Sequence, residues 1–102
     1  MAMRKGVLGE VLAVIEAHRT VLETTYKVKS LAVFGSVARD EARPDSDVDL
    51  LVEFDGPVGL FHFVEVKEYL KRILGRPVDL VMREGLKRQL KDRILKEAVS
   101  AR

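Results

Sequence analysis

The sequence predicts an α+β domain, an α/β sandwich in which a small sheet is flanked by helices. Hydrophobic residues follow a helical period in some segments and a two-residue period in others. The expected order is helix, strand, helix, strand, helix, strand, helix, which favours a sheet packed against helices and leaves the strand directions open. With 102 residues and 47% apolar content, the chain suits one domain over residues 1–102 with a single core.

The first third of the chain contains a long helix, a short strand and a tight turn. Apolar residues at helical spacing predict an amphipathic helix over 6–26. The apolar run 30–34 predicts a buried strand that ends at Gly35. Ser36 suits the N-cap of a short helix over 37–41.

The central segment reads as a turn followed by a strand. Arg43, Pro44, Asp45 and Ser46 are residues typical of turns. Residues 47–54 alternate, which predicts a strand with one wholly apolar face. That face consists of Val48, Leu50, Val52 and Phe54, and the opposite face of Asp47, Asp49, Leu51 and Glu53.

The last part of the chain contains a helix, a strand and a second helix. Helical spacing returns over 58–74, and Gly75 suits the position just after a helix C-terminus. Residues 77–82 predict a third strand, and 86–98 a final helix. The outer face of this final helix is basic, with Lys87, Arg88, Lys91 and Lys96.

Composition excludes several classes of protein. The chain has no cysteine, which excludes disulfides, cysteine-ligated metals and thiol nucleophiles. His18 and His62 lie far apart in the sequence, which disfavours a histidine-rich metal site, and we expect neither to be catalytic. No apolar run approaches the roughly 18 residues that span a bilayer. We therefore expect a cytoplasmic protein without membrane contact.

Charge is polarised along the chain. The net charge is only +2, too small to indicate nucleic-acid binding by itself. Residues 40–55 nevertheless hold seven acids against one base, and residues 83–102 hold seven bases against three acids. The basic segment is either a solvated helix face or a surface for an acidic partner or RNA.

The acidic segment contains a pattern that suits a metal ion. Asp47 and Asp49 lie two residues apart on the expected strand, so both side chains project to the same side. Two unpaired carboxylates so close repel each other. A hard cation such as Mg²⁺ removes this repulsion and keeps other positions for water and substrate phosphates.

Two further features complete a nucleoside triphosphate site. Gly35 permits close backbone approach, and the N–H groups at the helix opened by Ser36 attract phosphate. Asp79 is an acid in an otherwise apolar strand, where a charge is costly unless paired or bound to metal. Three acids suit two-metal phosphoryl transfer, with Asp79 on the ion that activates the attacking oxygen.

These residues resemble the minimal nucleotidyltransferases of the DNA polymerase beta superfamily. The likeness lies in residues 34–39, which contain Gly-Ser, in 44–52, which contain Asp-Val-Asp, and in 75–81, which hold the third acid. It covers roughly residues 30–98. The resemblance implies a small mixed sheet flanked by helices, the polymerase beta-like nucleotidyltransferase core.

The resemblance also implies a function and roles for individual residues. It implies transfer of AMP from ATP with two Mg²⁺ ions and release of pyrophosphate. Asp47, Asp49 and Asp79 would be the catalytic metal ligands, with Gly35 and Ser36 holding the triphosphate. Arg39 would either pair with an acid or contact phosphate. Small members of this family often act as antitoxins of HEPN-domain ribonucleases, and some attach AMP to a tyrosine of that toxin.

Each residue also has a plainer interpretation. Asp47 and Asp49 could lie on a solvated strand face, and Asp79 could pair with Arg76 or Arg83. Gly35-Ser36 alone would be an ordinary strand-to-helix turn. We expect Glu53 to be structural or solvated, and Ser46 to hydrogen-bond the turn backbone.

Three functions follow from these alternatives. The first is a Mg²⁺-dependent protein adenylyltransferase that modifies a cognate HEPN toxin as a type VII-like antitoxin. The second is a catalytically weak antitoxin that neutralises its partner by binding. The third is transfer to RNA or a small molecule, which the modest overall charge disfavours. Homo-oligomerisation stays open.

Overall fold

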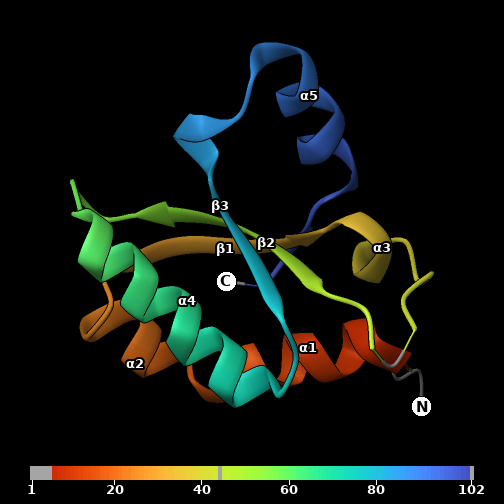
Figure 1. Cartoon of the computed structure of the whole chain (residues 1–102), viewed down its shortest axis with the longest axis horizontal. Helices are drawn as coiled ribbons and strands as arrows, with labels where there is room; N and C mark the ends of the chain where they lie inside the picture. The colour runs from red at the N-terminus through yellow and green to blue at the C-terminus, as the bar shows by residue number, and fades with distance from the viewer. Residues whose placement is uncertain (1–5, 44, 102) are drawn as a thin grey trace.

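A computed structural model of the chain describes residues 6–43 and 45–101. Figure 1 shows a sheet with helices on both sides. The strands are β1 (Val28–Phe34), β2 (Val48–Phe54), β3 (Val78–Met82) and β4 (Val99–Ser100). The helices are α1 (Gly6–Ala17), α2 (Arg19–Thr24), α3 (Gly35–Ala38), α4 (Leu60–Leu74) and α5 (Arg88–Glu97), with a 3-10 turn η1 (Arg83–Gly85).

The four strands form one mixed sheet in the order β3-β2-β1-β4. β1 pairs antiparallel with β2 and with β4, whereas β2 and β3 are parallel. The parallel pair requires a crossover, which α4 provides. This confirms the predicted α+β class, a small mixed sheet flanked by helices.

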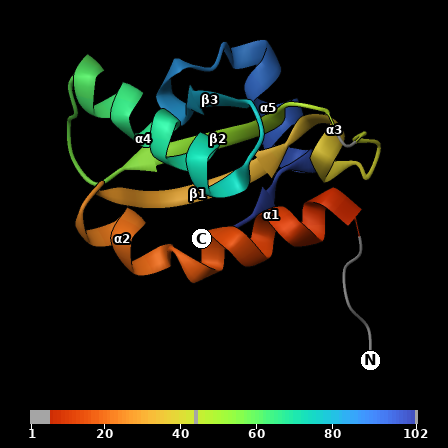
Figure 2. The same cartoon turned by 60° about the horizontal axis from the view of Figure 1, so that its bottom comes forward.

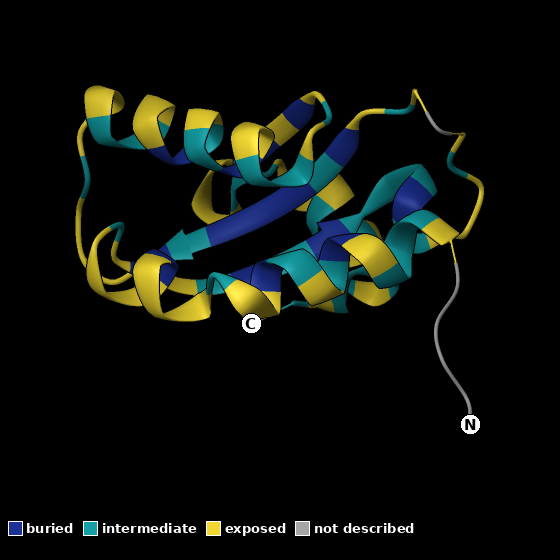
Figure 3. Ribbon diagram, turned by 90° about the horizontal axis from the view of Figure 1, so that it is seen from below, coloured by how far each residue is buried: buried dark blue, intermediate teal, exposed yellow. Residues whose placement is uncertain are grey.

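One face of the sheet carries the core. The alternating apolar face expected of β2 is confirmed, since Val48, Leu50, Val52 and Phe54 are all buried. α1, α2 and α4 cover this face, as Figures 1 and 2 show. Figure 3 shows β2 buried between these helices, whose outer sides are exposed. The helices contribute Val11, Ile15, Leu22, Val66 and Leu70 to the buried cluster.

The single helix expected over 6–26 is wrong in its continuity and its end. The helix is interrupted at His18, and α2 ends at Thr24. The His18 ring lies 2.8 Å from the Tyr69 hydroxyl of α4, a tertiary contact that helical periodicity cannot predict. Tyr26 follows the helix and packs on Tyr69, with ring centroids 4.8 Å apart.

Other boundaries also differ from expectation. α3 begins at Gly35, with Phe34 in the N-cap position, so Ser36 lies inside the helix and the N-cap prediction for it is wrong. The final helix spans 88–97 rather than 86–98 and leads into β4, a two-residue strand without a local signal. The expected helix end at Gly75 is confirmed: φ is +65°, and its N–H donates to the Lys71 carbonyl.

The turn before β2 forms as expected where the structure describes it. The Arg43 N–H donates to Ser46 Oγ at 2.8 Å, and the Ser46 N–H to the Arg43 carbonyl at 3.0 Å. The predicted turn role of Ser46 is therefore confirmed, whereas Pro44 lies outside the described residues. Within those residues, no helix has both the length and the hydrophobicity to cross a membrane.

Candidate active site

Asp49 and Asp79 lie side by side on the parallel strands β2 and β3. They are direct partners in the register of the two strands. Paired residues on adjacent strands point to the same face, and neighbouring strands lie roughly 4.8 Å apart. Because Leu50 and Leu80 point into the core, the two aspartates lie on the opposite face of the sheet. Asp79 therefore lies on the same side of the sheet as Asp49.

Asp47 joins this pair from the residue preceding β2. Its charge acts on Asp49, whose pKa is raised by burial first and then by the charges of Asp79 and Asp47. Asp49 is half-buried, whereas Asp47 and Asp79 are exposed. The expectation that Asp79 is a charge in a buried strand is therefore wrong, because β3 alternates and turns this residue to water.

Gly35 holds the backbone of β1 against the Asp49 carboxylate. Phe34 is the register partner of Asp49, so the next residue lies directly beside that side chain. A Cβ on Gly35 would collide with the Asp49 carboxylate, and its φ is +72°. Both facts require glycine at this position. The close backbone approach expected from the sequence is present, with Asp49 as the near neighbour.

Arg39 follows α3 and pairs with two acids. Its Nε donates to the Glu41 carboxylate at 2.8 Å, and its Nη1 to Glu97 at 3.1 Å. The hydrogen bond to Glu41, followed by the charges of Glu97 and Glu41, raises the pKa of Arg39. Its predicted role as an ion-pair partner is confirmed, and phosphate contact stays a prediction. Ser36 lies on the same short helix, half-buried.

Glu97 belongs to the site and was missed by sequence reasoning. It lies at the end of α5, where one carboxylate oxygen accepts hydrogen bonds from the Gly35 N–H at 3.2 Å and from Arg39. Sixty-two residues separate it from Gly35. No spacing rule links the two positions, and an acid within a basic helix resembles an ordinary surface ion-pair residue.

Residues expected outside the site have other contacts. Arg83 pairs with Glu53, and Ser30 donates to the same carboxylate, which supports the structural role expected for Glu53. Arg76 pairs with Glu10. His62 Nε2 lies 2.6 Å from the Tyr26 carbonyl.

The three aspartates fit a hard divalent cation by their chemistry. Carboxylate oxygens are preferred ligands of Mg²⁺, which needs only one or two of them when water and phosphates complete its shell. Burial, and then repulsion by Asp79 and Asp47, raises the pKa of Asp49, and such an ion would relieve the repulsion. Within residues 6–43 and 45–101, no group of three or more acid or histidine side chains is arranged to hold a metal ion by itself. The arrangement therefore suits an ion bound together with a phosphate ligand.

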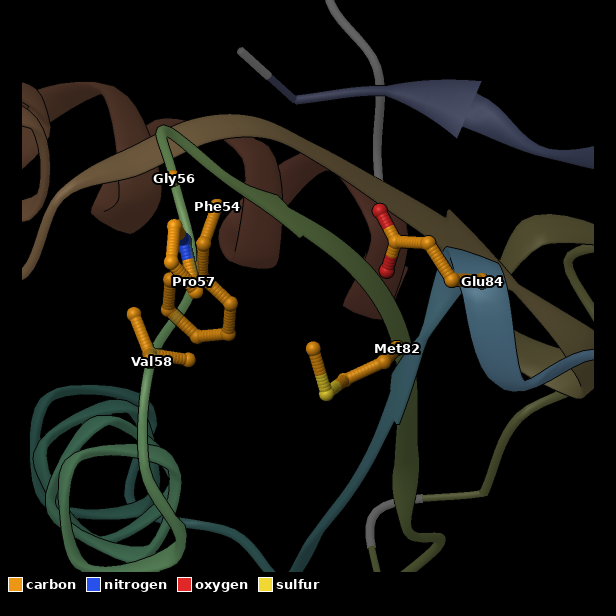
Figure 4. A pocket seen from close by; sticks show the side chains of 6 residues that line it. All are labelled: Phe54, Gly56, Pro57, Val58, Met82 and Glu84. Carbon is orange, nitrogen blue, oxygen red and sulfur yellow. The ribbon is translucent and has the colours of Figure 1, made fainter.

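A hollow of about 490 Å³ lies elsewhere on the molecule (Figure 4). It is lined by Phe54, Gly56, Pro57, Val58, Met82 and Glu84. Phe54 comes five residues after Asp49 on β2, which separates the two by roughly 16 Å along the strand. This hollow is therefore distinct from the acidic site.

Acids on two neighbouring strands beside a glycine–serine turn, on this mixed sheet, are the features implied by the resemblance to nucleotidyltransferases of the DNA polymerase beta superfamily. Residues 15–101 match the nucleotidyltransferase domain family. The protein adenylyltransferase MntA of Thermococcus cleftensis is 42% identical over 92 residues, which cover 90% of this chain and 93% of that protein. The chain therefore belongs to the nucleotidyltransferase domain family.

Solved structures agree with this assignment. A minimal nucleotidyltransferase superposes with a TM-score of 0.71 at 40% identity, covering 86% of this chain and 93% of its own. A toxin–antitoxin structure with AMP-PNP superposes with a TM-score of 0.67 over 93% of this chain and 72% of the other. At 17% identity, this second likeness supports the fold alone.

Proposed function

We propose that this chain is a Mg²⁺-dependent protein adenylyltransferase that transfers AMP from ATP to a hydroxyl group of a partner protein. The observation that carries the proposal is the register pairing of Asp49 with Asp79, beside Asp47 and Gly35. The name of the Thermococcus relative supports AMP as the group and protein as the acceptor.

Each residue takes a role that follows from its place. Asp47 and Asp49 would hold Mg²⁺ with the triphosphate, and Asp79 would complete a second ion. Gly35, Ser36 and Arg39 would contact the phosphates, because they offer backbone N–H groups and a guanidinium beside the acids. The bound ions supply charge neutralisation of the triphosphate and of the departing pyrophosphate.

The reaction is a displacement at the α-phosphorus. The acceptor hydroxyl oxygen forms a bond to this phosphorus, while the bond to the bridging oxygen breaks and pyrophosphate leaves. Asp79 is exposed, and its carboxylate would accept the hydroxyl proton. The products are an AMP ester of the acceptor and pyrophosphate.

The partner is a HEPN-type toxin in this proposal, and the chain is its antitoxin. Structures with the same fold have been solved as MntA–HepT toxin–antitoxin complexes. At 18% identity in one case, the likeness to them shows the fold, and the partner class is our inference from the family resemblance. A tyrosine is the acceptor that the family resemblance implies.

Labelled ATP tests the proposal. The chain, Mg²⁺ and ATP labelled at the α-phosphate are incubated with the protein encoded by the neighbouring gene, and label on that protein is measured. We expect label with the wild type and a loss of at least 100-fold in Asp47→Asn/Asp49→Asn, since both metal ligands are gone. Glu53→Gln is the matched control, because Glu53 lies on the same strand face but pairs with Arg83. Equal labelling by wild type and double variant would refute the assignment.

Neutralisation by binding is the second candidate, favoured by the exposed basic residues of α5. Arg88, Arg93 and Lys96 of α5 are exposed, as is Lys87 just before it. The double aspartate variant separates the two candidates in cells that express the toxin. Full rescue of growth favours binding, and lost rescue favours AMP transfer.

A further inference from the structure

The Glu97 carboxylate accepts hydrogen bonds from the donors that, in the proposed function, bind phosphate. A single oxygen, Oε1, accepts from the Gly35 N–H at 3.2 Å and from Arg39 Nη1 at 3.1 Å. A backbone N–H next to a guanidinium is a typical site for a phosphate oxygen. Here an acid of the same chain occupies both donors.

The negative charge of Glu97 also acts on the aspartates. It is one of the four charges that act on the pKa of Asp49, with Asp79, Asp47 and Arg39. Glu97 therefore adds a fourth negative charge at the site. A bound triphosphate would meet this charge directly, and Glu97 and a phosphate cannot occupy the same donors together.

The segment that carries Glu97 is held by few interactions. α5 is described in full and contains no buried residue. β4 follows it and pairs with β1 at only two positions, Val99 with Val33 and Ser100 with Ala32, extended by the Ala101 N–H on the Leu31 carbonyl. A helix without buried side chains opens at low cost. The carboxylate can thus leave its donors without disruption of the core.

We propose that Glu97 is an intramolecular competitor of the nucleoside triphosphate. Its carboxylate occupies the phosphate site by accepting hydrogen bonds from Gly35 and Arg39, and the nucleotide binds when Glu97 moves away. This inference rests on the proposed function, since it assumes that these donors serve phosphate. Glu97 thereby sets the nucleotide affinity without contributing to the chemistry.

The test compares nucleotide affinity in two variants with the same change in charge. Glu97→Gln removes the competing charge, whereas Asp92→Asn removes an exposed acid from the same helix. Binding of AMP-PNP with Mg²⁺, and of inorganic tripolyphosphate with Mg²⁺, is measured by calorimetry. We expect Glu97→Gln to bind both ligands about 10-fold more tightly than the wild type, since charged hydrogen bonds no longer need to be broken. Asp92→Asn should stay within about 2-fold.

The outcomes separate the inference from the proposed function. If the wild type binds AMP-PNP and Glu97→Gln binds no more tightly than Asp92→Asn, the competition is refuted and the proposed function stands. If no variant binds AMP-PNP while thermal melts show folded protein, the proposed function fails and the inference fails with it.

A measurement on the wild type covers the case in which Glu97→Gln does not fold. The ¹³C resonance of the Glu97 side-chain carboxyl is followed during titration with AMP-PNP and Mg²⁺. We expect it to move towards the position of a solvent-exposed glutamate such as Glu84. A Glu97 resonance that does not move at saturation would overturn the proposal.

Discussion

The negative charge of Asp49 suits the proposed metal site but is unfavourable for the stability of the fold. Its carboxylate is half-buried beside Asp79 and Asp47, so its negative charge is unfavourable in the folded protein without a cation. A stability-optimised protein would place a neutral residue here. An unfavourable residue that is kept at one position is typical of functional sites.

Because the charge of Asp49 is unfavourable, we predict that Asp49→Asn stabilises the protein without metal at pH 7. Burial and neighbouring acids raise the pKa of Asp49, so the folded state holds its proton more tightly than the unfolded chain. This contribution to stability is complete below the unfolded pKa, about 3.9, and is lost as pH rises through the folded pKa. Since the group is partly solvated and its repulsion screened, we expect a gain of about 0.5 kcal/mol at pH 7.

Urea unfolding at several pH values measures this effect. The gain from Asp49→Asn should shrink as the pH falls through the raised pKa of Asp49, and it should be lost below about pH 3.9, as the wild-type aspartate becomes protonated in both states. Asp55→Asn removes an exposed acid beyond the far end of β2 and is the control for net charge. An equal gain from both variants would show that the local cluster has no special effect.

Gly35 predicts a second effect at the residue scale. Gly35→Ala should destabilise the protein by about 2–4 kcal/mol, because both a positive φ and a collision with the Asp49 carboxylate oppose a side chain. Gly75→Ala is a matched control with a φ of +65° and open space at its Cβ. It should cost only about 1 kcal/mol. Equal free energies of unfolding for the two variants would contradict the close approach of Gly35 to Asp49.

At the scale of elements, α4 has one side packed in the core and another exposed to solvent. Its inner side reaches the core at Leu70, which is fully buried, whereas Leu60 at its first turn is 75% exposed. Leu70→Ala should cost about 2–5 kcal/mol because it leaves a cavity under the sheet. Leu60→Ala should cost less than about 0.5 kcal/mol. Thermal or urea unfolding measures both, and similar losses would contradict the position of α4 on the sheet.

Elements with strong periodicity were predictable from sequence, and those fixed by tertiary contacts were not. The period-two pattern of β2 correctly placed Val48, Leu50 and Val52 in the core. β4 has two residues and exists because its backbone pairs with the edge of β1, which leaves no periodic signal. His18, at the break between α1 and α2, likewise has its contact with Tyr69, 51 positions away.

The same distinction holds for the site. The spacing of Asp47 and Asp49 on one strand, with a glycine at the preceding strand end, already predicted that these groups converge. Asp79 was predicted as a site residue from its place in the third strand, although the argument that it is buried was wrong. Glu97 came from the folded structure alone, because only the packing of α5 near α3 brings it to Gly35.

At the scale of the whole molecule, nucleotide binding should stabilise the fold. A ligand that binds only the folded state raises its stability by mass action. At free ATP–Mg²⁺ ten times its Kd, the gain is about 1.4 kcal/mol, or about 6–11 °C in Tm for a domain of this size. Asp47→Asn/Asp49→Asn should show no shift, and Glu53→Gln should shift as the wild type does. A Tm unchanged by ATP and Mg²⁺ in the wild type would indicate that the triphosphate site does not form.

Paramagnetic Mn²⁺ in place of Mg²⁺ tests most directly whether Asp47, Asp49 and Asp79 share a cation with the nucleotide. With AMP-PNP bound, NMR resonances near the ion broaden. We predict the strongest broadening at these three aspartates and Gly35, and weaker broadening at Phe54, which lies roughly 16 Å from Asp49 along β2. Broadening centred elsewhere, or broadening that persists unchanged in Asp47→Asn/Asp49→Asn, would contradict the account.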